Sequence, residues 1–196
     1  MKILVTGAKG FIGKNLIAEL RNKKNIEIYE YHRSSSIQDL DNYTRDCDFV
    51  FHLAGINRPK NDNEYLEGNV GLTSYLIKML KKHKNKSTIM FSSSTQAKLI
   101  NPYGQSKNLA ENKLFEYSKE NNVKVLVYRL TNVFGKWCKP NYNSVVATFS
   151  HNIANGLPIK LNDPDVVMNL IYIDDLVKEL INSLSGNENI KGKFCF

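Results

Sequence analysis

The stretch MKILVTGAKGFIGKNLIAEL (residues 1–20) combines an apolar run, three regularly spaced glycines and a segment with a helical apolar pattern. The apolar run KILVT predicts a buried strand, and apolar residues recur on one face of the next segment, which predicts a helix from Phe11. Between them stand Gly7, Gly10 and Gly13 in the spacing G-x-x-G-x-x-G. In this context glycines allow a tight turn, a close approach of the backbone to a pyrophosphate, and close packing of the helix on the strand. The stretch therefore favours a dinucleotide-binding loop over a purely structural turn.

The rest of the chain continues this alternation of strands and helices. Further strands are predicted at IEIYEYH, CDFVFHLAG, STIMFSSS and VKVLVYRL, and helices near residues 69–82 and 103–121. Such an alternation forms a parallel sheet buried on both faces, so the sequence predicts an α/β fold, a Rossmann-type doubly wound parallel sheet. We assign residues 1–130 to this dinucleotide-binding domain and residues 131–196 to a partial substrate-binding lobe.

Composition argues against several classes of function. The chain of 196 residues has no apolar run near the roughly 20 residues of a membrane span and no secretory signal, so we expect no membrane partner and a cytoplasmic location. Three scattered cysteines and four scattered histidines indicate reduced thiols and argue against a metal site. The net charge of +8 includes the basic run KMLKKHKNKS. We interpret this run as a solvated helix end rather than a nucleic-acid patch, although a basic surface would attract an anionic small substrate.

The residues after the second strand indicate which dinucleotide binds. An acidic residue about 20 positions beyond the glycine motif would hold the ribose hydroxyls, whereas an arginine there accommodates the 2′-phosphate of NADP. Arg33 stands at this position, after His32 and before three serines, so we expect NADP. The alternative is that Arg33 is merely exposed and Glu30 binds the ribose, but Glu30 lies within the predicted strand rather than at its end.

Three residues form a candidate catalytic group. Tyr103 and Lys107 are four residues apart in PYGQSK and would share one face of a helix. An ammonium beside a phenol favours the phenolate and lowers its pKa, so Tyr103 could pass a proton to a substrate oxygen during hydride transfer. Ser94, at the end of the preceding strand, could donate a hydrogen bond to the same oxygen. A tyrosine and a lysine four residues apart occur by chance on many helices, and three serines can form a turn. The order in which these residues follow the glycine motif is the specific signal.

These motifs and their order resemble the extended short-chain dehydrogenase/reductase family, to which nucleotide-sugar epimerases, dehydratases and reductases belong. The resemblance covers nearly the whole chain through TGAKGFIG, HLAG, GNVGLT, FSSS, PYGQSK, RLTNVFG and LIYIDDLV. It implies that Ser94, Tyr103 and Lys107 are the catalytic triad, that Lys107 also holds the nicotinamide ribose, and that Asn132 contacts a sugar nucleotide. The other cofactor-binding residues that we expect are Gly7, Gly10, Phe11, Ile12, Gly13, His32, Arg33, Leu53, Ala54, Gly55 and Asn69.

Within this family, GAKGFIGKNL, HLAGINRP and FGKWCKPNYNSVVATF resemble the reductase domain of bifunctional capsular polysaccharide enzymes of the kind found in staphylococci. Such an enzyme acts in UDP-N-acetyl-L-fucosamine biosynthesis, where a cupin domain epimerises the sugar at C3 and the reductase domain reduces the C4 ketone with NADPH. The resemblance implies a UDP-sugar substrate. Trp137 and Tyr142 offer stacking faces for a sugar or base, and Lys136 and Lys139 could meet a diphosphate. Alternatively, the two aromatic residues simply pack the second lobe.

Two other functions fit the same features. The triad also serves NAD-dependent epimerases and dehydratases, which keep their NAD tightly bound and recycle it. A non-catalytic NAD(P)-binding module or an inactive fragment is the alternative of another class, against which the intact Ser94, Tyr103 and Lys107 argue. We also expect a homodimer.

The predicted second lobe has a helix near residues 145–155, a strand at LPIKL and a helix at 174–184. Met168 stands where many family members carry an arginine that helps to hold the nucleotide. The end GKFCF indicates a shortened chain that binds NADPH but binds a sugar nucleotide weakly. Because burying such an apolar side chain is worth roughly 1.5–3 kcal/mol, the strand-like KFCF is predicted to join a small sheet of the substrate lobe in an intact enzyme. In this chain, Phe194, Cys195 and Phe196 are predicted to be disordered or sheltered by a neighbouring molecule.

Overall fold

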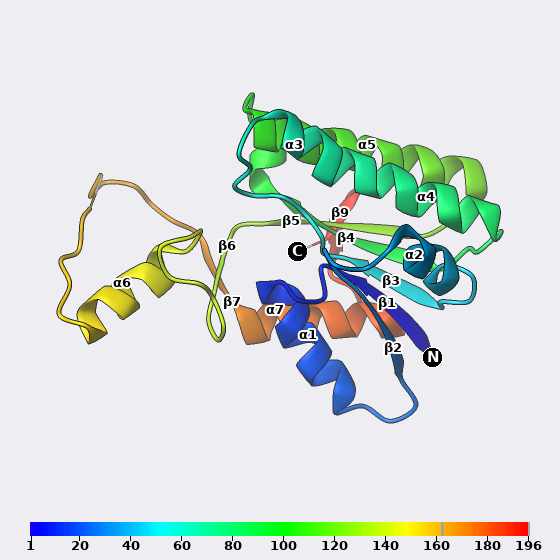
Figure 1. Cartoon of the computed structure of the whole chain (residues 1–196), viewed down its shortest axis with the longest axis horizontal. Helices are drawn as coiled ribbons and strands as arrows, with labels where there is room; N and C mark the ends of the chain where they lie inside the picture. Colours follow the sequence, from blue (N-terminus) through cyan, green and yellow to red (C-terminus); the bar gives the residue numbers. More distant parts are fainter. Residues whose placement is uncertain (162, 196) are drawn as a thin grey trace.

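The computed structural model describes residues 1–161 and 163–195. Within them, a sheet of seven strands has the order β2-β1-β3-β4-β5-β9-β8 (Figure 1). Neighbouring strands from β2 to β9 pair in parallel, and β8 pairs with β9 in antiparallel orientation. The predicted α/β fold with a parallel sheet is confirmed. The strands of this sheet are β1 (Lys2–Thr6), β2 (Glu27–Tyr31), β3 (Phe49–His52), β4 (Thr88–Ser94), β5 (Val125–Leu130), β8 (Ile190–Lys191) and β9 (Phe194–Cys195).

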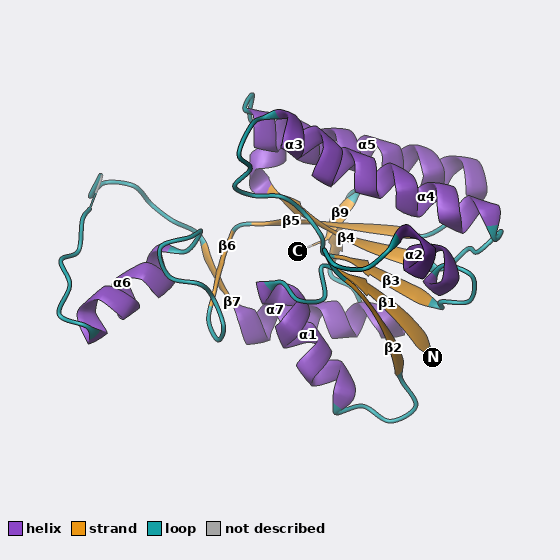
Figure 2. Cartoon of the chain, in the orientation of Figure 1, coloured by secondary structure: helices purple, strands orange, loops and turns teal. Residues whose placement is uncertain are grey.

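Helices cover both faces of the sheet (Figure 2). Ile3 and Val5 of β1 face a core shared with α1 and α7, while Leu4 between them faces the core shared with α2, α4 and α5. Successive side chains of a strand point to opposite faces, so a continuous apolar run is buried fully only when both faces are covered. The helices of these two layers are α1 (Phe11–Arg21), α2 (Ile37–Tyr43), α4 (Leu72–Lys82), α5 (Pro102–Asn121) and α7 (Ile173–Asn182).

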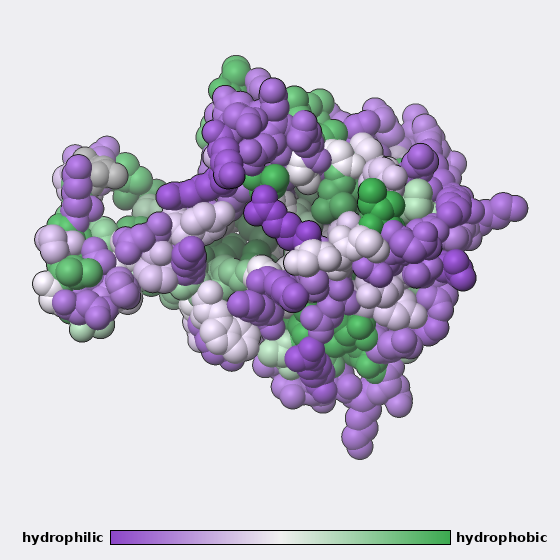
Figure 3. Space-filling view, viewed as in Figure 1, coloured by the Kyte–Doolittle hydropathy of each residue, from purple (hydrophilic) through white to green (hydrophobic). Residues whose placement is uncertain are grey.

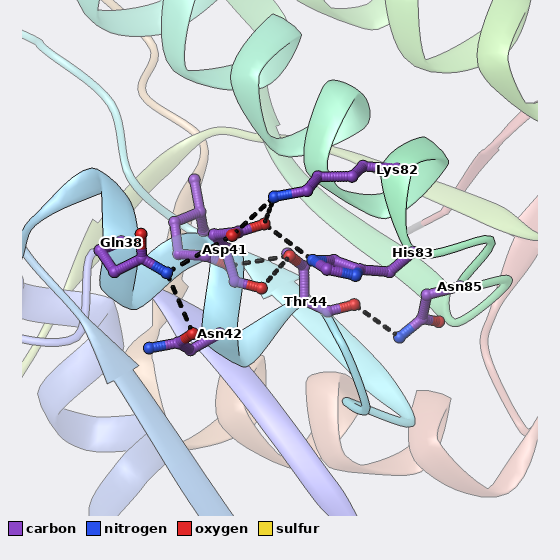
Figure 4. Close-up of polar contacts among 8 residues, drawn as sticks. Gln38, Asp41, Asn42, Thr44, Lys82, His83 and Asn85 are labelled. Carbon is purple, nitrogen blue, oxygen red and sulfur yellow. Dashed lines mark hydrogen bonds and ion pairs between the residues drawn. The ribbon is translucent and has the colours of Figure 1, made fainter.

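The short helix α2 is absent from the predicted elements, because its seven residues are too few to show a helical apolar period. Its Asp41 joins it to the end of α4: the carboxylate accepts hydrogen bonds from Lys82 Nζ (2.8 and 2.9 Å) and pairs with His83 Nε2 (2.7 Å) (Figure 4). Hydrogen bonds from Lys82 and His83 hold the pKa of Asp41 below its usual value. Lys81 pairs with Glu120 of α5. The basic run at the end of α4 thus supplies structural ion pairs.

The segment from 131 to 172 leaves the sheet as an arm that carries α6 (Val145–Ala154) (Figure 1). At its base, β6 (Asn132–Phe134) and β7 (Leu170–Tyr172) pair in parallel. The helix predicted at 145–155 is present, although none of its residues is buried. The prediction of a strand at LPIKL is wrong: residues 157–161 form no strand and are exposed. An apolar run becomes a strand only where a partner strand can satisfy its backbone groups.

The end of the described chain returns to the sheet. α7 packs on α1, and β9 pairs with β5 through Cys195 and Tyr128. The Arg129 guanidinium carbon lies 3.9 Å from the centre of the Phe194 ring. The prediction that KFCF is disordered or sheltered by a neighbour is therefore wrong for Phe194 and Cys195, which join the main sheet rather than a sheet of the lobe; Phe196 lies outside the described residues. The open edge of β5 supplies the backbone partners.

The division of the chain at residue 130 stays a prediction, but α7 and β9, which lie beyond residue 130, pack with the sheet. The first residue of α7, Ile173, also contacts the base of the arm at Gly135. The remaining elements are short. α3 (Asn63–Tyr65) continues through the π-helix η1 (Leu66–Gly71) into α4, and two 3₁₀ turns, η2 (Thr95–Lys98) and η3 (Ser183–Ser185), follow β4 and α7.

Replacing Gly13 by alanine tests how closely α1 must approach the loop before it. A Cβ at Gly13 would lie 2.3 Å from the Gly7 carbonyl oxygen, which belongs to the backbone and cannot rotate away. We expect Gly13→Ala to lower the free energy of unfolding in urea by roughly 1–3 kcal/mol. Gly71→Ala is the matched control, because a Cβ there would lie 3.8 Å from the nearest backbone oxygen. The control should be neutral or stabilising by up to about 1 kcal/mol. Equal stability of the two variants would contradict the prediction.

Candidate active site

The glycine loop joins β1 to α1 at the carboxyl edge of the sheet. Gly7 has a φ of +73°, and a Cβ there would lie 2.7 Å from the Ala54 backbone nitrogen. The Gly10 N–H donates to the Gly7 carbonyl (2.8 Å) and closes the turn. α1 begins after Gly10 without a side-chain cap and without an acidic residue in its first turn. Its unpaired N–H groups and the positive end of its dipole suit a phosphate.

A cavity of about 1090 Å³ extends from this loop toward the arm, and Figure 3 shows the hollow at that edge. Parallel strands end at the same edge, so residues from distant parts of the sequence meet there. The predicted cofactor residues that line it are Gly7, Gly10, Phe11, Ile12, Gly13, Leu53, Gly55 and Lys107. The other predicted residues in the lining are Ser94, Tyr103, Asn132, Trp137, Lys139 and Tyr142. Trp137 and Tyr142 are 53% and 40% exposed, so they do not pack a lobe core.

Some predicted residues lie outside this lining: His32, Arg33, Ala54, Asn69 and Lys136. The Ala8 N–H donates to the Tyr31 carbonyl (3.2 Å), which places the end of β2, and hence His32 and Arg33, beside the glycine loop. Lys136 instead lies over the Trp137 ring, with Nζ 4.5 Å from its centre. Met168 is also outside the lining.

Within residues 1–161 and 163–195, no three His, Cys, Asp or Glu side chains come together as a metal site would require. Cys47, Cys138 and Cys195 are unpaired. Of the helices in the same ranges, none is both long and apolar enough to cross a bilayer.

Ser94, Tyr103 and Lys107 come together in the cavity. Ser94 ends β4, and the other two residues lie one turn apart at the start of α5. That start is fixed by Asn101, whose side chain accepts a hydrogen bond from the Gly104 N–H (2.7 Å). Lys107 Nζ donates to the Ser92 carbonyl (2.9 Å) and lies 6.0 Å from the centre of the Tyr103 ring.

The protonation of this group differs from the expectation. Burial raises the pKa of the Tyr103 phenol, and interaction with the Ser94 hydroxyl offsets part of the rise. The expected lowering by Lys107 is not found, because its ammonium faces Ser92 and burial lowers its own pKa to about 8. Tyr103 therefore keeps its proton at neutral pH and is suited to donate it.

A buried ion pair lies beyond Lys107, between α5 and β5. Arg129 donates to both oxygens of the Glu111 carboxylate (2.9 and 2.6 Å), to which the Ser93 hydroxyl also donates. Glu111 lies one turn after Lys107 and raises its pKa, against the effect of burial. The pair therefore favours the charged form of the lysine.

A hydrogen-bond chain runs behind the cavity through the fully buried His52. The Thr73 hydroxyl donates its proton to the Asn69 carbonyl (2.7 Å), so it accepts from His52 Nε2 (2.9 Å). His52 Nδ1 is then the unprotonated nitrogen and accepts from the Thr6 hydroxyl (2.7 Å). The Thr6 oxygen accepts in turn from the Ala54 N–H (3.2 Å). The chain therefore requires a neutral imidazole protonated at Nε2, and burial lowers the pKa of His52 to about 3.

Asn69 extends this hydrogen-bond chain to α5. Its amide oxygen accepts from the Ile56 N–H (2.7 Å), and its amide nitrogen donates to the Ser106 hydroxyl (2.9 Å). The Ser106 hydroxyl donates to the Tyr103 carbonyl (2.7 Å). Asn69 thus acts on the site by positioning the loop after β3 and the first turn of α5.

Several lining residues are not among the predicted ones, including Arg58, Tyr65 and Gln96. The Tyr65 ring centre lies 5.7 Å from that of Tyr103. Arg58 belongs to the motif HLAGINRP, but the sequence did not indicate its place in the cavity, because a loop lacks the regular repeat that shows on which side of a helix or strand a residue lies. The described lining contains no Asp or Glu, and its cationic residues are Lys9, Lys14, Arg58, Lys107 and Lys139.

The His52 chain predicts a specific loss of stability in acid. The usual pKa of 6.5 falls to about 3 in the folded state, so between these values the unfolded chain binds a proton that the folded protein does not. Stability should therefore fall as the pH drops from 6.5 toward 3. His52→Gln should have a lower free energy of unfolding at pH 7. Its free energy of unfolding should also fall less steeply on acidification, by up to about 1.4 kcal/mol per pH unit, because the variant lacks this titrating group.

Urea unfolding at several pH values measures this slope. His151→Gln, an exposed position on α6, is the control and should leave the slope unchanged. An unchanged slope in His52→Gln would refute the assignment.

Comparisons with known proteins agree with this geometry. A model of the NAD dependent epimerase/dehydratase family matches residues 3–193. The UDP-2-acetamido-2,6-beta-L-arabino-hexul-4-ose reductase of Pseudomonas aeruginosa is 43% identical over 186 residues, which cover 95% of this chain and 50% of that protein. The crystal structure of the capsular polysaccharide assembling protein CapF from Staphylococcus aureus is similar with a TM-score of 0.89 and 44% identity, over 99% of this chain and 53% of that chain.

The UDP-glucuronic acid 4-epimerase from Bacillus cereus, in complex with NAD, has a TM-score of 0.86 at 22% identity over 99% of this chain and 77% of its own, which shows a likeness of fold. This chain spans about half the length of the Pseudomonas and Staphylococcus relatives. Because the family match runs from the first strand of the sheet almost to the last, the chain belongs to the NAD dependent epimerase/dehydratase family.

Proposed function

We propose that this chain is an NADPH-dependent reductase of a 4-keto UDP-sugar in the synthesis of a capsular or surface polysaccharide precursor. The observation that carries the proposal is the meeting of Ser94, Tyr103 and Lys107 in the cavity that begins at the glycine loop. The named activity of the 43% identical Pseudomonas reductase supports the substrate class.

The residues of the chain have complementary parts in this reaction. NADPH, when bound, supplies the hydride. The Tyr103 phenol, which its raised pKa keeps protonated, donates its proton to the ketone oxygen, and the Ser94 hydroxyl donates a hydrogen bond to that oxygen. Lys107 holds the nicotinamide ribose and provides positive charge beside the tyrosine. The bare N–H groups at the start of α1 suit the pyrophosphate of the cofactor.

The choice of NADP over NAD rests on the end of β2. Glu30, the alternative ribose ligand, is engaged by Arg21 of α1, whose Nη2 donates to its Oε1 (2.7 Å). Arg33 is exposed and enters no ion pair among residues 1–161 and 163–195. A free guanidinium beside the glycine loop suits a 2′-phosphate. A cytoplasmic location and a homodimer remain predictions.

A second enzyme class stays open, because the family includes epimerases and dehydratases that use the same triad. Those enzymes return the hydride to the sugar within one cycle, whereas a reductase consumes one NADPH per product. A non-catalytic binding module would bind NADPH without consuming it. Stoichiometric loss of NADPH absorbance in the presence of a 4-keto UDP-sugar separates the three.

Tyr103→Phe tests the proton donor. The variant keeps the ring but loses the hydroxyl, so we expect NADPH oxidation with a 4-keto UDP-sugar to slow by roughly 10²–10⁴-fold while NADPH affinity is unchanged. Tyr75→Phe, on the partly exposed side of α4, is the control and should retain full activity. A Tyr103→Phe variant as fast as the unaltered chain would exclude the tyrosine as the acid.

Arg33→Asp tests the cofactor choice. Loss of a charge-assisted contact with the 2′-phosphate should weaken NADPH binding roughly ten- to a hundredfold and leave NADH binding little changed, which fluorescence titration measures. Lys24→Asp introduces the same change of charge on the exposed turn after α1 and should leave the ratio of the two affinities unaltered. An unaltered ratio in Arg33→Asp would remove the reason for choosing NADP.

A further inference from the structure

We propose that Arg58 and Lys139 form a diphosphate-binding subsite at the arm end of the cavity, where they hold the diphosphate of the sugar nucleotide. This inference rests on the proposed function for the identity of the nucleotide. The subsite itself rests on the charge and geometry of the cavity.

The two cations meet around one aromatic ring. The Arg58 guanidinium carbon lies 5.4 Å and Lys139 Nζ lies 5.7 Å from the centre of the Tyr142 ring. The two residues come from different segments, the loop after β3 and the first part of the arm, and both line the cavity. Two positive side chains from different segments therefore lie near the same ring at this end of the cavity, where their charge favours an anion.

A hydrogen bond orients the Arg58 side chain, but no carboxylate among the described residues pairs with its charge. Its Nε donates to the Asn143 side-chain oxygen (2.9 Å), which ties the loop to the arm. Neither of its Nη nitrogens has a hydrogen-bond partner among residues 1–161 and 163–195, and no carboxylate in those ranges pairs with it. Two parallel N–H donors at a fixed spacing are the geometry with which arginine binds phosphate oxygens.

The cations of the cavity fall into separate groups. Lys9 lies within the glycine loop and Lys14 follows it, Lys107 is held by the Ser92 carbonyl, and Arg58 and Lys139 lie near the Tyr142 ring. Because the described lining contains no carboxylate, the positive charge of Arg58 and Lys139 is not compensated within it. The glycine loop has its own phosphate site at the start of α1, so the Arg58 end is left for a second anionic molecule.

The Arg58 loop also adjoins the proposed proton donor. The carbonyl of Asn57, the preceding residue, accepts a hydrogen bond from the Tyr65 hydroxyl (3.2 Å), and the Tyr65 ring packs against Tyr103. The proposed subsite and the proposed proton donor are therefore linked through Tyr65 on the wall of one cavity.

Calorimetric titration of the whole chain with UDP, UMP and NADPH tests the subsite without requiring turnover. We expect Arg58→Gln to weaken UDP binding roughly tenfold or more and UMP binding much less, with NADPH binding unchanged. Arg58→Lys should recover only part of the loss, because an ammonium cannot offer two parallel donors. Lys139→Gln should give a smaller loss in the same direction. Lys60→Gln, two positions beyond Arg58, exposed and outside the lining, is the matched control and should change nothing.

The outcomes separate this inference from the proposed function. If UDP binds the unaltered chain and Arg58→Gln binds it equally well, the subsite is overturned and the reductase proposal stands. If Arg58→Gln weakens UDP, UMP and NADPH alike, Arg58 only maintains the cavity and the subsite is again overturned. If UDP does not bind, GDP and dTDP are titrated in the same way. Arg58-dependent binding of either supports the subsite and removes uridine from the proposed function, whereas no binding of any of the three overturns the subsite.

Discussion

The one-way hydrogen-bond chain through His52 is the interaction on which the site depends. It begins at the Ala54 N–H and ends at the Asn69 carbonyl, and each hydroxyl in it both donates and accepts. Thr6 immediately precedes the glycine loop, while the Asn69 side chain reaches α5 through Ser106. The glycine loop and the first turn of α5 are therefore supported by the same buried residues. Removing one member would leave a buried polar group unpaired, which typically costs about 1–3 kcal/mol.

At this edge of the sheet, buried and exposed cations differ in whether a carboxylate lies beside them. The deepest cation, Lys107, is kept charged against burial by Glu111, whose own charge is matched by Arg129. The shallower cations around the cavity have no carboxylate beside them in the described lining. Buried charges that are paired serve structure, whereas exposed and uncompensated charges are available to a ligand. Lys82 and Arg58 are both exposed, but the Lys82 ammonium is paired with Asp41, whereas Arg58 has no carboxylate partner among the described residues.

The two ends of the cavity differ in burial. The end at the glycine loop lies on the sheet, whose two faces are covered by helices, whereas the other end is formed by the arm, where α6 has no buried residue. Trp137, in the first part of the arm, has a φ of +68°, a backbone conformation that residues other than glycine rarely adopt. Among the described residues, Arg58 donates to Asn143 and the Asn15 side chain donates to the Lys136 carbonyl (3.0 Å), and both contacts join the arm to the rest of the protein. A ligand at that end would therefore contact a part of the protein that is less buried than the sheet.

From the sequence alone one can derive the main alternation of strands and helices, the parallel sheet and the candidate residues Gly7, Ser94, Tyr103 and Lys107, because apolar periods and turn residues act over a few neighbouring positions. The contacts that those residues make follow only from the folded structure. Among the described residues, LPIKL has no partner strand, whereas Phe194 and Cys195 form a strand that pairs with β5. The Lys107 ammonium faces Ser92 and does not lower the pKa of Tyr103, and Arg58 lines the cavity. Strand pairing, burial and charge depend on groups that are far apart in the chain, and no local pattern of residues records which of them come together.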